Sequence, residues 1–151
     1  MKKNFLALAV LLITGLTSAF ANKVEGNKRA VESFGREFAN AQNVSWVEQK
    51  DYSKATFSLY NHIMFAYYDK EGQLLAVVRN LLSDQLPLRL LTEMKKKYSG
   101  YWISDLFEVD SEDQTSYYLT LENADEKIVL RSDGIEHWSV YKKEKKNTVD
   151  L

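Results

Sequence analysis

The sequence has no cysteine, one proline, six glycines and two histidines among its 151 residues. Without cysteine there are no disulfide bonds, so stability must come from a packed core. Two histidines and no cysteine also disfavour a structural zinc site. The scarcity of proline and glycine argues against a long disordered segment before the C-terminal tail. Hydrophobic residues make up 45% of the chain, which is enough for a core.

The N-terminus has the pattern of an export signal. Lys2 and Lys3 precede an apolar run over 5–16, and Ser18 to Ala21 ends in small residues of the A-x-A type. The run is shorter than the roughly 20 residues that span a bilayer, although a retained membrane anchor is the alternative. We therefore predict a signal peptide over 1–21, cleaved after Ala21. The mature protein would be periplasmic or secreted, with no stable membrane anchor.

The mature chain has little excess charge of either sign. Without Lys2 and Lys3, 18 of the 20 basic residues remain, against 21 acidic residues. Nucleic-acid binding requires a basic face, so we expect no nucleic-acid partner.

The first half of the mature chain predicts one helix and four strands. From Arg29, apolar residues at Val31, Phe34 and Phe38 follow a helical spacing. Alternating or short apolar segments then predict strands at 44–48, 52–60, 63–68 and 74–78.

The second half repeats this order. Pro87 suits the first turn of a helix, for which Ser83 or Asp84 is the expected cap. Its apolar positions are Leu88, Leu91, Met94 and Tyr98, and Gly100 ends it. Four strands are predicted at 101–109, 116–121, 127–130 and 135–141.

Corresponding landmarks in the two halves lie 59 to 62 residues apart, as for Val44 with Ile103 and Gly72 with Gly134. We therefore predict an α+β fold of two tandem α-β-β-β-β units, 22–82 and 83–141. Residues 142–151 are predicted to be a basic flexible tail. Contact of its lysines with an anionic surface is the alternative to a solvated terminus.

Two short turns carry an Asp and a Gly, in "YYDKEGQLLA" (67–76) and "VLRSDGIEHWSV" (129–140). The Asp side chain can accept hydrogen bonds from nearby backbone N–H groups, and Gly can take a positive φ. An EF-hand would need further oxygen ligands at alternate positions, and these are absent. The turns are therefore expected to serve backbone geometry and to bind no ligand.

Several motifs along the chain resemble one exported family. They are the step Ala41-x-x-Val44-x-Trp46, Phe57, the turn Tyr68-Asp69-x-x-Gly72, Leu86-Pro87, and the step Lys97-Tyr98-x-Gly100-Tyr101-x-Ile103. Together they resemble the PepSY-like, beta-lactamase-inhibitor-like (BLIP-like) exported proteins of Bacteroidetes over nearly the whole mature chain.

The resemblance implies two antiparallel sheets joined side by side, with both helices on one face. It also implies binding more than catalysis, because the similar beta-lactamase inhibitory protein grips an enzyme with a concave sheet. The present chain departs from that inhibitor in having no cysteines, whereas the inhibitor carries disulfides. A shared fold alone does not transfer function.

The sequence offers no catalytic set. His62 and His137 are not equivalent in the repeat, and Ser139 near His137 lacks a nucleophile elbow. Acidic residues cluster at turns, where solvation is usual, with loop calcium binding as the alternative. We expect no catalytic residue, cofactor or metal. The acidic residues are Asp110, Glu112, Asp113, Glu122, Asp125 and Glu126.

Aromatic residues are the notable excess. Leaving out Phe5 and Phe20, 17 of the 19 aromatic residues remain in the mature chain. Helices that cover one sheet face would leave some of these rings on the open face, where aromatic residues favour protein contacts. The alternative is that they stabilise the sheet across strands. The candidate partner-binding residues are Tyr60, Tyr68, Tyr118 and Trp138.

The sequence thus predicts a non-enzymatic exported module that engages or inhibits another exported protein, for instance a hydrolase, through an open aromatic face. A carrier with a small-ligand pocket between sheet and helices is the alternative, and an enzyme is the third class considered.

Overall fold

The computed structural model describes residues 26–112 and 114–146. The predicted signal peptide, 1–21, and residues 147–151 of the predicted tail lie outside this part. The described elements, in chain order, are α2 (Lys28–Glu37), β1 (Gln42–Glu48), β2 (Ser53–Leu59), β3 (His62–Tyr68), β4 (Leu74–Asn80), the short 3₁₀ helix η1 (Ser83–Gln85), α3 (Leu88–Lys97), β5 (Trp102–Asp110), β6 (Thr115–Glu122), β7 (Glu126–Asp133) and β8 (Ser139–Lys145).

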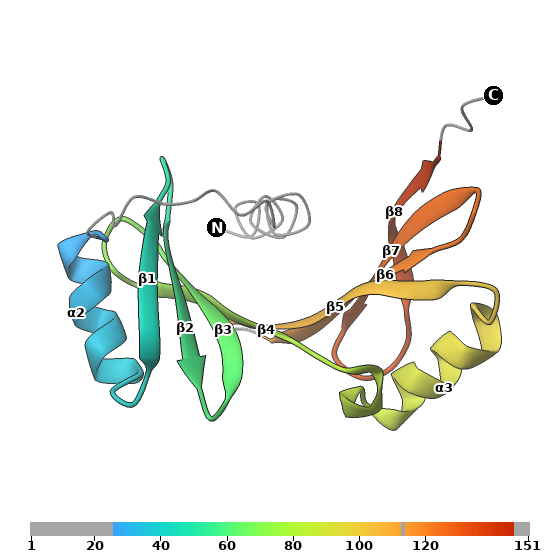
Figure 1. Ribbon diagram of the computed structural model, residues 1–151, viewed down its shortest axis with the longest axis horizontal. Coiled ribbons are helices and arrows are strands. Elements are labelled where there is room, and N and C mark those ends of the chain that lie inside the picture. The colour runs from blue at the N-terminus through green and yellow to red at the C-terminus, as the bar shows by residue number, and fades with distance from the viewer. Residues whose placement is uncertain (1–25, 113, 147–151) are drawn as a thin grey trace.

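The eight strands form one antiparallel sheet in the order β1 to β8, so every strand pairs with its neighbour in the chain. This confirms the predicted α+β fold of two helices, each followed by four strands. Figure 1 shows the bent sheet with α2 at one end and α3 at the other, both on its convex side. The helix-free face is therefore the concave one.

The two halves of the sheet join where β4 pairs with β5. Four residue pairs make this seam: Val77 with Asp110, Val78 with Val109, Arg79 with Glu108, and Asn80 with Phe107. The Arg79 guanidinium donates to both oxygens of the Glu108 carboxylate, at 2.7 and 3.1 Å. This bidentate ion pair ties the two units together on the face that carries the helices.

Alternation along the strands places both helices on the same face. Ala30 and Phe34 of α2 pack on residues of β2 and β3, namely Ala55, Phe57, Ala66 and Tyr68. Leu90 and Met94 of α3 pack on residues of β5, β6 and β7, namely Leu106, Leu119, Leu121, Ile128 and Leu130. The pairing register carries this face without interruption across the seam.

The buried side of each helix differs from the predicted one by a fraction of a turn. Val31 is 40% exposed and Leu88 is 77% exposed, although both were expected in the core. Phe34 and Met94 are buried as predicted, and the residues buried with them are Ala30 and Leu90, four positions earlier in each helix.

The start of α3 also differs from the prediction. Pro87 occupies the cap position without a side-chain hydrogen bond. Ser83 and Asp84 belong to η1, where the Gln85 side chain accepts a hydrogen bond from the Leu82 N–H at 2.8 Å.

The last strand lies further along the chain than predicted. Residues 142–145 were assigned to a flexible tail, but they belong to β8, which pairs with β7 from Arg131 to Glu126. An edge strand needs no apolar period, because lysines are common protection for an exposed edge. Ion pairs replace apolar contacts here: Lys143 lies 2.8 Å from Glu126, and Lys142 lies 2.5 Å from Glu144.

The two Asp–Gly turns share backbone conformation and differ in surroundings. Gly72 and Gly134 have φ values of 82° and 85°. In the first turn, the Asp69 side chain accepts a hydrogen bond from the Gln73 N–H at 2.8 Å, as expected. A Cβ atom on Gly72 would lie 2.7 Å from the Arg29 carbonyl carbon, whereas one on Gly134 would meet nothing within 4 Å. The first turn therefore also packs closely against the backbone of α2.

The β2–β3 turn is unusual in carrying a bulky residue at positive φ. Tyr60 and Asn61 form a two-residue loop with φ values of 50° and 64°, as a type I′ turn requires. Asn and Gly are favoured there, while Tyr is disfavoured. Tyr60 is nevertheless 81% exposed, so no packing offsets this cost.

The two glycine turns predict unequal effects of the same substitution. Gly134→Ala should lower the free energy of unfolding by about 1–2 kcal/mol, the cost of a left-handed non-glycine residue. Gly72→Ala should cost ~1–3 kcal/mol more, since the added methyl group overlaps the Arg29 backbone. Urea unfolding of both variants tests this, and equal losses would contradict the docking of α2 on the first turn.

The β2–β3 turn predicts a stabilising substitution. Tyr60→Asn should raise the free energy of unfolding by about 1 kcal/mol, because Asn tolerates the left-handed conformation. Tyr60→Leu is the matched control, since it removes the ring and keeps a side chain that is unfavourable at positive φ. A gain for both variants in thermal unfolding would show that the ring, and not the backbone, is the source of the cost.

Candidate functional site: the helix-free sheet face

The face opposite the helices carries a second apolar cluster. We call it the helix-free face, and it consists of the alternate residues of the strands that point away from α2 and α3. Each unit contributes three aromatic rings. They are Tyr52, Phe65 and Tyr67 from the first unit and Phe107, Tyr118 and Tyr141 from the second, with Leu75, Ala76, Val78, Val109 and Val129 among them.

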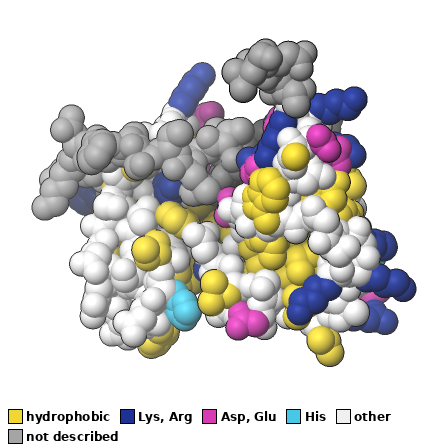
Figure 2. All heavy atoms as spheres, turned by 45° about the vertical axis from the view of Figure 1, so that its right-hand side comes forward, with side chains coloured by type: hydrophobic (Ala, Val, Ile, Leu, Met, Phe, Trp, Pro, Cys, Tyr) yellow, Lys and Arg dark blue, Asp and Glu magenta, His cyan; other side chains and the backbone are white. Residues whose placement is uncertain are grey.

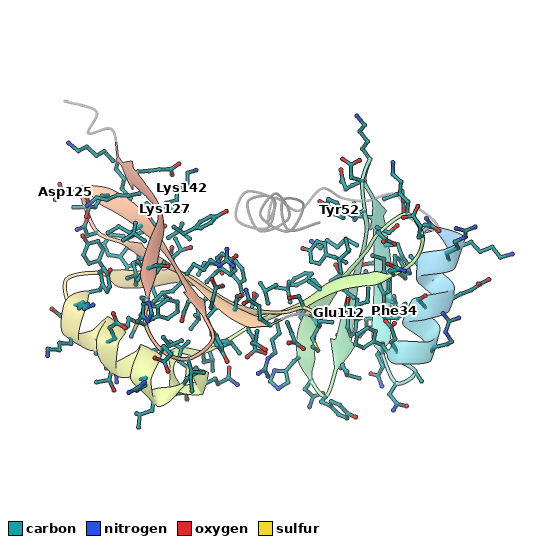
Figure 3. All side chains as sticks on the ribbon, turned by 180° about the vertical axis from the view of Figure 1, so that it is seen from behind. Phe34, Tyr52, Glu112, Asp125, Lys127 and Lys142 are labelled. Carbon is teal, nitrogen blue, oxygen red and sulfur yellow. The ribbon has the colours of Figure 1, made fainter. Side chains whose placement is uncertain are left out.

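The rings are packed in an ordered way within each unit. Tyr52 and Tyr67 lie 5.6 Å apart between centroids. Phe107 stacks on Tyr118 at 5.3 Å and 14°, and Tyr118 meets Tyr141 edge-on at 5.8 Å. Val78 and Val109 pair across the seam between these two groups. The result is one apolar strip that runs over both units, and Figure 3 shows Tyr52 on this side and Phe34 between α2 and the sheet.

Burial on this face increases from its border to its centre. Tyr67, Phe107 and Tyr118 are buried, whereas Tyr52, Phe65 and Tyr141 are only half-buried. Burial raises the pKa of Tyr67 and raises that of Tyr118 to about 12. A tyrosine hydroxyl is already neutral at physiological pH, with an ordinary pKa of about 10, and burial here disfavours its ionisation further.

Two cations lie over these rings, one in each unit. The Lys54 ammonium is 4.6 Å from the centroid of Phe65 and 6.0 Å from that of Tyr67. The Arg131 guanidinium is 5.7 Å from the centroid of Tyr118. Both distances are in the range of cation–π attraction. The face is thus apolar at its centre and carries positive charge at defined places.

An acidic group lies on the same face in the second unit. Asp105 pairs with Thr120 of β6, next to the buried Leu106 that points to α3. Burial raises the pKa of the Asp105 carboxyl group, although the Leu106 N–H and the charge of Lys127 act in the opposite direction. The ionised carboxylate is consequently held in an environment that disfavours it.

The predicted site residues are divided among three places. Tyr60 lies exposed at the β2–β3 turn, and Tyr118 lies on the helix-free face but is only 2% exposed. Tyr68 and Trp138, expected on the open face, lie instead beneath the helices. The Tyr68 hydroxyl donates to Glu37 of α2 at 2.8 Å, and the Trp138 indole N–H donates to the Leu90 carbonyl of α3 at 2.9 Å.

The prediction missed Tyr52, Phe65, Tyr67, Phe107 and Tyr141. The signal for two of them was present in the β2–β3 hairpin, because the loop Tyr60–Asn61 places Phe57 opposite Met64. With Phe57 on the core side, Phe65 and Tyr67 must point to the other side. The strands predicted at 52–60 and 63–68 place this turn at 61–62, which would pair Phe57 with Ala66 and give the same alternation. The two rings were missed because the register was not applied to the faces of the hairpin.

Two of the turn acids, Glu122 and Glu126, are paired with lysines. Glu122 lies 2.8 Å from Lys146, and Glu126 lies 2.8 Å from Lys143 and accepts a hydrogen bond from Tyr101. Hydrogen bonds from these lysines are the main cause that lowers the pKa of both carboxyl groups. Within 26–112 and 114–146, no three His, Cys, Asp or Glu side chains are placed to hold a metal ion.

A small hollow lies between α3 and the sheet. Its volume is about 280 Å³, and it is lined by Met94, Lys95, Tyr98, Ser99, Tyr101, Ile103 and Leu121. Figure 2 shows the surface of this half of the molecule, where apolar side chains reach the surface and lysines and arginines gather at the outer margin.

None of the helices in the described part has the length and apolar character of a membrane span.

The burial of Asp105 predicts a pH-dependent effect on stability. Its folded-state pKa is raised, so the group costs nothing while both states are protonated and destabilises the protein as pH rises through its titration. The gain in stability of Asp105→Asn over the unmodified protein should therefore be larger at pH ~7 than at pH ~3.5, which lies below the ordinary Asp pKa of about 3.9. Chemical unfolding at both pH values measures this. Asp84→Asn, at an exposed position, is the control, and a gain that is equal at both pH values would contradict the assignment.

Comparison with solved structures finds this fold in several proteins of Bacteroides. A protein provisionally described as periplasmic, from Bacteroides eggerthii, superposes with a TM-score of 0.72 at 10% identity, over 81% of this chain and 90% of that one. A BLIP-like protein from Bacteroides fragilis gives 0.69 at 17% identity, over 84% and 91%. A DUF2874 family protein from Bacteroides ovatus gives 0.72 at 16% identity, over 81% and 89%.

No family model matches the sequence, and no curated protein matches it. At these identities the structural likeness concerns the fold, and nearly the whole of each similar chain is covered. The protein therefore has the fold of the BLIP-like and DUF2874 proteins of Bacteroides.

Proposed function

We propose that this protein is an exported, non-enzymatic binding module that docks another exported protein on its helix-free face. The observation that carries the proposal is the strip of six aromatic rings, three from each unit, on the sheet face that no described helix covers. Tyr52, Phe65 and Tyr141 are half-buried and supply the accessible part of this strip. Aromatic residues are enriched in protein interfaces.

The shape of this surface favours a macromolecular partner over a small ligand. The strip crosses the seam and extends over strands of both units, from Tyr52 beside β2 to Tyr141 of β8. Small-molecule sites are enclosed clefts of about 300–1,000 Å³. The hollow beside α3, at about 280 Å³, is near the lower limit of that range and has few convergent polar groups. A small-ligand carrier remains the second candidate on that observation alone.

Two further facts support export and binding. The N-terminal sequence has the pattern of a signal peptide, and one similar fold is provisionally described as periplasmic. Another similar fold is described as BLIP-like. On this basis inhibition of an exported hydrolase is the specific form of binding that we propose to test first.

The test is site-specific photo-crosslinking. A photoreactive phenylalanine analogue at Phe65 or Tyr141, which are half-buried on the helix-free face, should form an adduct with the same partner from the exported protein fraction. The analogue at Leu88 or Val31, which are exposed on the helices, is the matched control and should give no such adduct. Adducts from the helix positions alone would place the partner elsewhere and contradict the proposal.

Substitution tests the same face by affinity. Phe65→Ser should weaken binding of the partner so identified by about tenfold or more, as expected when an aromatic ring that the partner removes from water is lost. Leu88→Ser removes an apolar side chain of similar size from α3 and should leave affinity unchanged.

A second substitution tests the carrier function. A ligand that raises the melting temperature would favour a carrier if Ser99→Trp in the hollow abolishes the rise while Phe65→Ser has no effect on it.

A further inference from the structure

We propose that the partner inserts an acidic side chain at Lys54, so that the first unit recognises an Asp or Glu within an apolar segment of that partner. The inference rests on the proposed function and adds the chemistry that the helix-free face selects. It comes from the position of Lys54 among aromatic rings and from the distribution of counter-ions around the other cations.

Lys54 lies within the apolar part of the face. It is opposite Tyr67 on β3, and its ammonium group lies over the rings of Phe65 and Tyr67. The residue is half-buried, and burial lowers the pKa of its ammonium group. A cation–π contact offsets only part of the cost of removing a charge from water. The site therefore favours an anion.

Within the described residues no carboxylate pairs with Lys54, and this distinguishes it from the other cations near the face. Arg131, the cation over the rings of the second unit, lies on β7 and is held by Asp133 at 2.7 and 2.8 Å. The Asp133 carboxylate also accepts a hydrogen bond from Ser116 at 2.9 Å. Lys142, on the same face of β8, lies 2.5 Å from Glu144.

The chemistry of the expected group follows from these surroundings. A carboxylate at Lys54 would form a charge-assisted hydrogen bond in a partly dry environment, where such bonds are stronger than in water. The rings of Tyr52, Phe65 and Tyr67 beside it would cover apolar side chains next to the acid in the partner. We therefore expect recognition of an acidic residue flanked by apolar residues.

The experiment selects peptides from a random phage-displayed library on the purified protein. Selected peptides should be enriched in Asp or Glu next to apolar residues. Binding of a labelled synthetic copy should weaken by about tenfold or more in Lys54→Met, as expected when a desolvated ion pair loses one partner. Lys54→Arg keeps the charge and should retain most of the affinity, while Lys142→Met removes a neutralised cation and should change affinity by less than about twofold.

The outcomes separate this inference from the proposed function. Peptides that bind equally to Lys54→Met but lose affinity in Phe65→Ser overturn the role of Lys54 and leave the docking face intact. Peptides that are insensitive to both substitutions, or the absence of any selected peptide, overturn both proposals. Displacement of the peptide by sodium glutamate, and not by sodium chloride at equal ionic strength, would assign the site to a free carboxylate ligand and overturn a protein partner.

Discussion

The arrangement of this protein depends on the four residue pairs between β4 and β5. Because side chains alternate along a strand, a slip of one residue at this seam would turn the second unit over relative to the first. Val78 pairs with Val109 on the helix-free face, and Arg79 pairs with Glu108 on the opposite face. The ion pair and the valine pair are matched only in the observed register, so the seam keeps both helices on one side.

A continuous helix-free face is the direct consequence of this register. Each unit alone has a helix on one side and three aromatic rings on the other, and the seam aligns the two groups of rings into one strip. The strip also has ionisable groups of both signs beside it, Lys54 in the first unit and Asp105 in the second. Aromatic rings next to such groups are the chemistry on which the proposed docking of a protein rests.

The fold was predictable from the sequence to a greater degree than the site was. The helices, the strands and the Asp–Gly turns each have a local signature, and Gly72 adopts the positive φ that its turn implied. The sheet face on which a side chain lies changes with a shift of a single residue, and local sequence patterns resolve such shifts poorly. Tyr67 and Tyr68 are neighbours, yet one lies on the helix-free face and the other donates to Glu37 beneath α2. A β2–β3 turn one residue late keeps this alternation, so the distinction was lost because the hairpin register was not used to assign the two faces.

The C-terminal part of β8, residues 142–145, was missed for a different physical reason. Its lysines and glutamates have no apolar period, because an edge strand is held by its ladder and by ion pairs such as Lys143 with Glu126.

The duplicated units preserve backbone geometry more closely than they preserve contacts. Gly72 and Gly134 have nearly the same φ, but only Gly72 is pressed against a helix. Lys54 on β2 and Arg131 on β7 both lie over aromatic rings, but among the described residues only Arg131 has a carboxylate beside it. A charge that is neutralised within the fold contributes mainly to stability, whereas a half-buried charge without such a counter-ion favours an anion from outside. This difference between the two cations is the basis of the proposed recognition of an acidic side chain at Lys54.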